Sequence, residues 1–292
     1  MSDKPANAPD AFFAVPDIHP VQLQGPDAGR FAQAQFMGDV DALAVGHWQW
    51  NGWLTPKGRV IALFALAKRA DDDLLLLLLD ADPEAFCSAL GRFQVRSKLK
   101  ISQRNDLLLS GAFRAPAVAR ADGFSALADG SLEFDLGTPR QPRVLQLGHP
   151  LPATLASGAS PLTQWRAFDL AHGLPRLPVA QASQWTPQQL SLERLRAYSV
   201  KKGCYPGQEI VARTHFLGQA KRGLVRLHGA GSIAASPDDG LEPAAVQATH
   251  DGSATVPIVS RAGPETLAVF QLDADATRFA IGDVAVRALP LE

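Results

Sequence analysis

The chain has 292 residues, 28 basic and 29 acidic side chains, and a formal net charge of −1. This length exceeds what one hydrophobic core usually fills, so two or three domains are expected, and the balanced charge gives no global field for nucleic acid or anionic lipid. Cys87 and Cys204 are the only cysteines, which excludes a disulfide framework and a cysteine-only zinc or iron–sulfur site within one chain. We therefore expect a reducing compartment, no strong nucleic-acid signal and no metal site made by this chain alone.

Neither an export signal nor a membrane span is expected from the hydropathy. Residues 1–10 are polar and contain proline, and they lack the apolar region of a signal peptide. The longest apolar run is Leu74–Leu79, whose six residues fall far short of the roughly 20 that a membrane helix needs. Aspartates bound this run on both sides, which predicts a buried strand with charged ends and no direct membrane contact.

The first half of the chain alternates strand and helix signals. The predicted strands cover residues 21–23, 47–53, 59–67, 74–79 and 95–101, with helices over 28–36 and 83–93. Asp27 and Asp82 are expected to cap these helices at their N-termini, and Pro83 suits a first helical position. The turn Pro56–Gly58 is expected to join two strands into a hairpin, against which the 74–79 strand pairs.

The second half contains a helix, a crossing segment, a distinctive loop and a series of short strands. Strands are predicted at residues 107–113 and 143–148, a helix at 165–172, an ordered crossing segment at 176–190, and a short helical stretch after it. Beyond Gly218 the predicted strands cover 221–227, 254–259, 267–272 and 284–289. They predict a small C-terminal β-barrel over residues 223–292, and residues 1–222 are expected to form an α+β region of two intertwined subdomains.

The loop Lys201–Gly207 combines two lysines, two glycines, a cysteine and a proline directly before a helix signal. Core packing would not select such a set of residues. Tyr205 precedes proline and is therefore biased toward extended geometry, while Pro206-Gly207 suits a type II turn. A helix is expected from Gln208 onward, which places the cysteine just ahead of a helix N-terminus.

The thiol of Cys204 is a candidate reactive group. The positive end of the helix dipole and the charges of Lys201 and Lys202 would all favour the thiolate. The alternative is a small hydrophobic residue in a tight turn, which is what most free cysteines are. Glu209 and Arg213 follow on the helix as a favourable i,i+4 pair.

A second candidate site is one for a flat heterocyclic ligand, which tryptophans and carboxylates could bind. Trp48, Trp50 and Trp53 could stack on such a ring, although cross-strand aromatic packing within a sheet is the favoured interpretation. A carboxylate could grip the amide and amino edge of the ring. The candidate acids, each of which is more often a helix cap or a surface charge, are Asp27, Asp39, Asp169 and Glu209.

Three segments carry a resemblance to a known family. The run KKGCYPGQEIVAR at residues 201–213 resembles the signature K-G-C-Y-x-G-Q-E-x-V-A-R of the YgfZ-type folate-binding proteins, which are related to the glycine-cleavage aminomethyltransferase, or T-protein. The segment 25–40 resembles the G-x-D-A-x-x-F motif of both families. A third motif, W-x-x-x-D-x-E-A-G-x-P, is matched from Trp165 to Pro175, except that Ala171 stands where the relatives have a glutamate.

The resemblance implies an α+β, T-protein-like fold of several subdomains that binds tetrahydrofolate or a derivative. It implies a cytoplasmic accessory factor for assembly or repair of iron–sulfur clusters, which supports tRNA-modifying enzymes and has folate and iron–sulfur client or assembly proteins as partners. In this interpretation Cys204 is the nucleophilic or redox-responsive group, and Lys201 and Lys202 lower its pKa. The implied cofactor contacts are Asp169, Tyr205, Gln208, Glu209 and Arg213.

Two alternatives remain open from the residues. A tetrahydrofolate-dependent aminomethyltransferase would need the acidic pair that its family carries after the hairpin turn, whereas Arg59–Phe64 contains no acid. A non-catalytic scaffold that has lost folate binding is kept open by Ala171, because the missing carboxylate would remove a charge-assisted contact. If the chain is catalytic, we expect a folate-dependent one-carbon or transferase-like activity.

Overall fold

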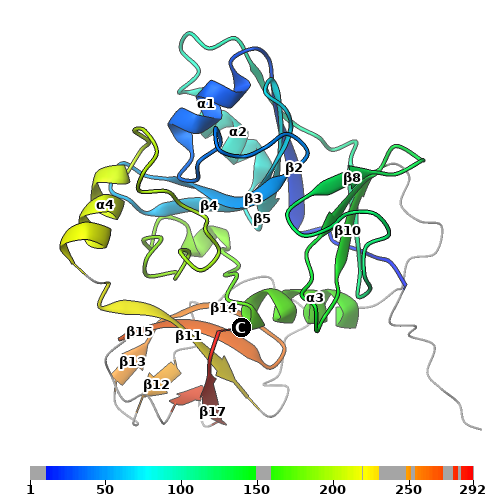
Figure 1. The fold of residues 1–292 in the computed structure, drawn as a ribbon. Helices are drawn as coiled ribbons and strands as arrows, with labels where there is room; N and C mark the ends of the chain where they lie inside the picture. Colours follow the sequence, from blue (N-terminus) through cyan, green and yellow to red (C-terminus); the bar gives the residue numbers. More distant parts are fainter. Residues whose placement is uncertain are drawn as a thin grey trace, which may run out of the picture.

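The computed structural model describes residues 11–148, 159–218, 220–229, 248–250, 254–271, 279–281 and 284–291. The expectations about residues 1–10 and about a strand end at Leu272 lie outside these residues. Within these residues the strands form three antiparallel sheets, and a segment between the second and third sheets crosses the centre of the molecule (Figure 1). Among the described helices, none combines the length and the apolar character needed to span a membrane.

The first sheet has the strand order β3-β4-β5-β2-β6 and carries α1 and α2 on one face. Its elements are β2 (Ile18–Gln24), α1 (Ala28–Gln35), β3 (Trp48–Leu54), β4 (Val60–Ala70), β5 (Asp73–Leu79), α2 (Pro83–Gly91) and β6 (Lys100–Gln103). Leucines 74, 76 and 78 of β5 pack toward the helices, and leucines 75, 77 and 79 pack into the central core. Burial on both faces explains why this strand has no polar alternation.

The predicted helix starts differ in how they are capped. Asp82 accepts a hydrogen bond from the Ala85 amide at 2.8 Å, so its capping role is confirmed. Asp27 occupies the N-cap position of α1, but its carboxylate accepts from the Lys98 amide at 2.6 Å instead. Because Lys98 is bound there, the strand predicted over residues 95–101 is wrong in its first part, and only β6 from Lys100 pairs with β2.

The second sheet has the order β1-β7-β10-β9-β8, and α3 packs on it. Its elements are β1 (Phe13–Ala14), β7 (Leu108–Ala112), β8 (Phe124–Ala126), β9 (Leu132–Asp135), β10 (Val144–Gly148) and α3 (Ala159–Ala171). A Cβ atom on Gly111 would lie 2.8 Å from the ring of Trp165, so a residue without a side chain allows α3 to approach β7 closely. The sequence predicted β7 and β10 but missed the three shorter strands.

The crossing segment leads to α4. It contains one 3₁₀ turn, η1 (Val179–Gln181), and the short helical stretch expected after it is wrong, because a series of turns is found there. Ser191 and Arg196 have φ values of 49° and 51° within these turns, which an α-helix does not allow. Helix α4 (Gln208–Leu217) follows the loop, as predicted.

The C-terminal strands form a curled sheet that is not a closed barrel (Figure 1). The order β13-β12-β16-β17-β11-β15-β14 comprises β11 (Arg222–His228), β12 (Ala248–His250), β13 (Ala254–Val256), β14 (Ile258–Ala262), β15 (Glu265–Gln271), β16 (Phe279–Ile281) and β17 (Val284–Leu289). The strand predicted over 254–259 is divided at Pro257, which has no amide hydrogen for a strand ladder. Its two parts are the opposite edges of the sheet, so the barrel prediction is corrected to a half-barrel.

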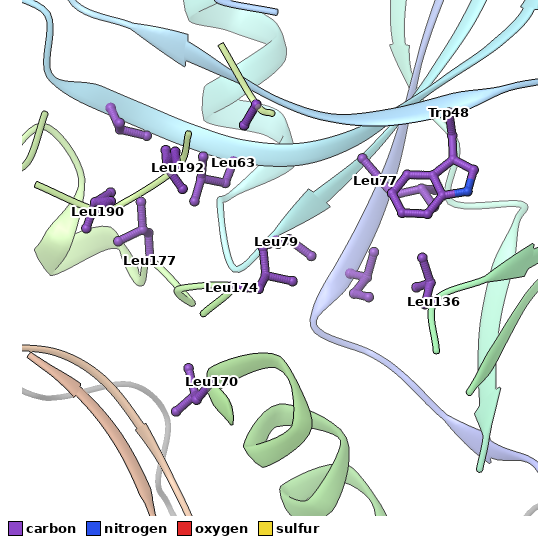
Figure 2. Packing of buried hydrophobic residues seen from close by; sticks show 14 of the residues in the cluster. Trp48, Leu63, Leu77, Leu79, Leu136, Leu170, Leu174, Leu177, Leu190 and Leu192 are labelled. Carbon is purple, nitrogen blue, oxygen red and sulfur yellow. The ribbon is translucent and has the colours of Figure 1, made fainter. Parts of the chain in front are cut away.

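One hydrophobic cluster joins the three sheets at the centre of the molecule. Figure 2 shows Trp48 of β3, Leu77 and Leu79 of β5, and Leu136 after β9 in this cluster, with Leu170 of α3 nearby. Residues of β14 and β15 belong to the same cluster. The division into domains at residue 222 stays a prediction, and the central junction is where the candidate site lies.

Candidate functional site

The loop before α4 has the predicted turn. Gly207 has φ 79° and ψ 0°, and the Gln208 amide donates to the Tyr205 carbonyl oxygen at 3.1 Å. These values are those of the third position of a type II turn, where glycine is the favoured residue. The prediction of a type II turn followed by a helix from Gln208 is therefore confirmed.

Gly207 also packs against the hairpin turn of the first sheet. A Cβ atom on Gly207 would lie 2.6 Å from the Thr55 carbonyl oxygen and 2.7 Å from Cα of Gly58. Gly58 has φ 68°, and a Cβ atom there would lie 2.9 Å from the side chain of Ile210 in α4. The two glycines thus allow the backbones of the two turns to touch, and this contact fixes the loop on the first sheet.

Lys202 is buried and holds the loop against the end of α1. Its ammonium donates to the carbonyl oxygens of Phe36 at 2.6 Å and Gly38 at 2.8 Å, and lies 5.0 Å from the centre of the Tyr205 ring. Burial lowers the pKa of Lys202 to about 8, although the charge of Asp39 opposes the shift. The proposed effect of this ammonium on the thiol of Cys204 stays a prediction.

Two other predicted cofactor residues are bonded within the loop. Tyr205 donates from its hydroxyl to the Ser199 carbonyl oxygen at 3.0 Å, and burial raises the pKa of this phenol. Gln208 donates from Nε2 to the Lys202 carbonyl oxygen at 3.0 Å. The hydroxyl of Ser199 accepts from the amides of Lys201 and Lys202, each at 3.2 Å. Ser199 thus organises the loop. Its position, two residues before Lys201, is a local turn signal that the sequence analysis did not use.

The remaining loop and helix candidates face solvent. Cys204 is a free, exposed cysteine, whereas Cys87 is partly buried and burial raises the pKa of its thiol. Glu209 and Arg213 form the expected ion pair at 2.7 Å, with side chains that are 80% and 61% exposed. This pair contributes little to stability, and its predicted role in cofactor binding stays a prediction.

A cavity of about 810 Å³ lies between β3, the second sheet and α3; we call it the large cavity. Aromatic rings and carboxylates share its walls, namely Trp48, Trp50, Phe168 and His172 with Asp122, Asp135 and Asp169. Phe168 and His172 stack on each other with ring centres 4.0 Å apart. The tryptophans both pack edge to face, at 5.3 Å, and line the cavity, so the two interpretations of these residues do not exclude each other.

Asp169 is part of a buried ion cluster at the wall of the large cavity. Its carboxylate contacts Arg143 at 2.7 Å and Arg176 at 3.0 Å. Arg143 is itself held with Cζ 4.0 Å from the ring centres of both Trp165 and Phe168. With both its oxygens next to guanidinium groups, Asp169 orders the wall of the cavity rather than offering an unpaired charge.

Arg176 joins α3 to the first sheet through the same cluster. It donates to both carboxylate oxygens of Asp80, at 2.6 and 2.7 Å, and to Asp17 at 2.8 Å. Burial alone would raise the pKa of Asp17, but the nearby charges of Arg176 and Arg166 hold it below its ordinary value. Burial dominates at Asp80 and raises its pKa. The three aspartates neutralise three arginines in the interior.

A smaller cavity of about 460 Å³, the side cavity, adjoins the large cavity and extends to Ser199. It shares Trp48, Trp50, Asp122 and Leu195 with the large cavity. Ser199, which anchors the loop, also lines it. The structure therefore places Ser199, which anchors the loop of Cys204, at the side cavity and Asp169 at the large cavity. Glu209 and Arg213 lie on the exposed surface of α4.

The aromatic rings and carboxylates that line the large cavity fit the flat ring and the N–H edge of a reduced pterin. The indole nitrogen of Trp48 is buried and has no hydrogen-bond partner among the described residues. Asp135 is partly exposed, and one of its oxygens accepts only from the Gly137 amide, at 3.1 Å. Asp122 and Asp135 were missed by the sequence analysis because both lie beside turns that carry no motif. Ala171, at the end of α3, is buried, while its neighbour His172 lines the cavity.

The fold is that of a glycine-cleavage aminomethyltransferase. The structure of glycine cleavage system aminomethyltransferase T from Bartonella henselae superposes with a TM-score of 0.68 over 95% of this chain and 84% of its own, at 13% sequence identity. Such a low identity supports the shared fold alone. The predicted T-protein-like fold is thereby confirmed. No family model matches the chain.

Bacterial proteins named tRNA-modifying protein YgfZ are homologues of this chain. The protein of Klebsiella pneumoniae is 28% identical and aligns over 98% of this chain and 94% of its own length. That of Serratia proteamaculans is 29% identical over 80% and 76%. The predicted resemblance to the YgfZ-type proteins is confirmed.

Proposed function

We propose that this chain is a folate-binding factor in tRNA modification, and that it acts in the assembly or repair of iron–sulfur clusters. The large cavity is the observation that carries the proposal. It combines aromatic rings with carboxylates at the junction of an aminomethyltransferase fold, and homologous proteins carry the name tRNA-modifying protein. The iron–sulfur role rests on the resemblance of the Cys204 loop to its family signature.

Tetrahydrofolate would present a flat ring whose edge carries an amide and an amino group. In our proposal Trp50 stacks on this ring and Asp135 accepts from its edge, because both line the large cavity and neither is fully buried. Asp169 positions the wall through Arg143. This assignment replaces the carboxylate that the family has at the position of Ala171.

The exposed thiol of Cys204 is proposed as the group that meets a client protein. Lys202 and Tyr205 hold the loop in its turn, and Ser199 connects it to the side cavity. A client could thus contact the thiol while folate occupies the neighbouring cavity. The aminomethyltransferase alternative is less favoured, because Arg59–Phe64 in the hairpin supplies no acid for methylene transfer.

Anaerobic calorimetric titration with tetrahydrofolate tests whether the protein binds this ligand. We expect micromolar binding, and Trp50→Ala should weaken it about tenfold through loss of ring stacking. Trp185→Ala is the matched control, because Trp185 is also partly buried but lines neither cavity. No heat at two temperatures would overturn the folate proposal and support a scaffold.

Complementation in cells tests whether the thiol of Cys204 is needed for function. Cells that lack the native protein would receive this chain or its Cys204→Ser variant, and the modification of their tRNA would be measured. We expect the wild-type chain to restore modification by iron–sulfur enzymes and the variant to fail. Equal restoration by both chains would overturn the role of Cys204. Turnover with an aminomethyl-loaded lipoyl protein would instead favour the aminomethyltransferase alternative.

A further inference from the structure

A third cavity, of about 380 Å³, is lined by residues at the start of β4, in the crossing segment, near the end of α4 and at the start of β11. We call it the basic cavity. Its cationic side chains are Arg59, Lys221 and Arg222, which come from the first sheet and the start of the third. It shares no lining residue with the large or the side cavity.

The basic cavity is distinguished by its charge. Among the described residues that line it, none is acidic, whereas the large cavity has three aspartates. Lys221 and Arg222 are both exposed, and neither forms an ion pair with a described residue. Three like charges around one cavity repel each other in the absence of an anion, so their convergence from distant parts of the chain indicates an anion-binding function.

Arg59 is fixed in place at the wall of this cavity. Its Nη1 donates to the Gln184 carbonyl oxygen at 2.8 Å and to Oε1 of Gln189 at 3.1 Å. Both bonds use the same nitrogen, so the other N–H groups of the guanidinium remain for a ligand. A guanidinium that is already ordered loses little freedom when it binds an anion.

One neutral side chain, Gln189, adds a further donor. Oε1 of Gln189 accepts from Arg59 and from the amide and hydroxyl of Thr186, at 3.0 and 3.3 Å. These bonds fix the amide orientation, so that the Nε2 donor of Gln189 is the group left for a ligand. The Thr214 hydroxyl donates to the Ile210 carbonyl oxygen. The hydroxyls of Thr186 and Thr214 thus already use their protons, and the donors left for a ligand are the three cations and Nε2 of Gln189. Such a set suits a ligand that consists mainly of acceptors.

We propose that the basic cavity binds a phosphoryl group, either of an RNA backbone or of a free phosphate. A phosphoryl group carries more acceptor oxygens than a carboxylate, and three cations with an amide donor match it better. The site is independent of the proposed folate cavity, because no residue is common to the two. The chain's net charge of −1 means that such a contact would be local.

Binding to the full chain would be measured with inorganic phosphate and, separately, with unmodified tRNA, in chloride buffer of fixed ionic strength. The test variant is Lys221→Gln with Arg222→Gln, whose side chains are exposed and whose loss should not prevent folding. The control is Arg30→Gln with Arg92→Gln, which removes the same charge from exposed positions outside the basic cavity. Circular dichroism would verify that both variants fold.

We expect the test variant to bind at least about tenfold more weakly than the wild type, and the control to change by less than about twofold. Weakened binding of inorganic phosphate identifies a free phosphate as sufficient. Binding of tRNA without binding of inorganic phosphate, again weakened only in the test variant, identifies the RNA backbone as the source. Absence of binding to either probe, or equal weakening in both variants, overturns the proposal. The folate titration is a separate readout, so the two proposals can fail independently.

Discussion

Lys202 donates from its ammonium to the carbonyl oxygen of Phe36 over 2.6 Å, although 166 positions separate the two residues. The bond connects the loop of Cys204 to the end of α1, and a second bond to Gly38 at 2.8 Å strengthens this connection. Lys202 therefore has a structural role of its own, which is to hold the loop in place, in addition to the effect on Cys204 that the signature implies.

The connection should depend on pH. Burial lowers the pKa of Lys202 from 10.5 to about 8, so between these values the unfolded chain binds a proton that the folded chain has released. The free energy of unfolding should therefore increase as the pH rises through this window, by up to about 1.4 kcal/mol per pH unit. Lys202→Met should abolish this gain and, by leaving two carbonyl groups unpaired, lower stability by about 1–3 kcal/mol.

Urea unfolding at several pH values from 8 to 10 measures the difference between wild type and Lys202→Met. Measurement stops at pH 10, because the raised pKa of Tyr205 and of Tyr198 would lower stability above it. Lys201→Met, which removes an exposed amine from the same loop, is the control. A difference that stays flat or shrinks as the pH rises would contradict the expectation.

Gly207→Ala should destabilise the protein. The residue has φ 79°, and its new Cβ atom would meet the Thr55 oxygen at 2.6 Å, so strain of about 1–3 kcal/mol is expected in addition to the overlap. Gly203→Ala in the same loop is the matched control, because a Cβ atom there meets no atom within 4 Å. Thermal unfolding of the two variants should separate them clearly. Equal midpoints would show that the contact between the two turns contributes nothing.

Cys204 should react with iodoacetamide before Cys87 in the native protein. Cys204 is exposed, whereas Cys87 is partly buried and the pKa of its thiol is raised by burial. Mass spectrometry of a time course at neutral pH would assign the modified residue. The Cys204→Ser variant should react only slowly, and a Cys87→Ser variant should keep the fast phase. Faster modification of Cys87 would refute this order.

Arg176→Met should be the most destabilising single change among those considered. It would leave Asp80, Asp17 and Asp169 buried with fewer partners, and removal of one member of a buried ion pair costs about 3–5 kcal/mol. Arg30→Met is the control, because its pair with Asp27 is at the surface and should contribute less than about 1 kcal/mol. Urea midpoints would be compared, and a similar effect of both changes would contradict a structural role for the cluster.

The features that the sequence predicted correctly depend on local signals. The Asp82 cap, the hairpin at Gly58, the strand Leu74–Leu79 and the turn at Gly207 are each encoded within a few residues. The first part of the strand predicted over residues 95–101 was wrong because Lys98 is bound by Asp27, which lies 71 positions away. No local pattern carries that information.

The candidate site was predictable only in part. The loop was found because its unusual residues are consecutive, but two of the three aspartates that pair with Arg176 lie 96 and 159 positions away. Asp122 and Asp135 reach the large cavity through turns between short strands, which have weak sequence signals. The barrel prediction failed at Pro257, where a single residue divides one strand between the two edges of the sheet.

Both faces of β5 consist of leucines, so hydrophobicity alone does not determine the register in which this strand pairs with its neighbours. If the strand slipped by one residue, leucines 74, 76 and 78 would exchange faces with leucines 75, 77 and 79, and both faces would remain apolar. Polar contacts at the two ends oppose such a slip, since Gln22 donates to Asp73 at 2.7 Å and Arg176 contacts Asp80 at 2.6 Å. Asp73 and Asp80 thus fix the register of β5, and their contacts disfavour a misfolded state in which this strand pairs one residue out of register.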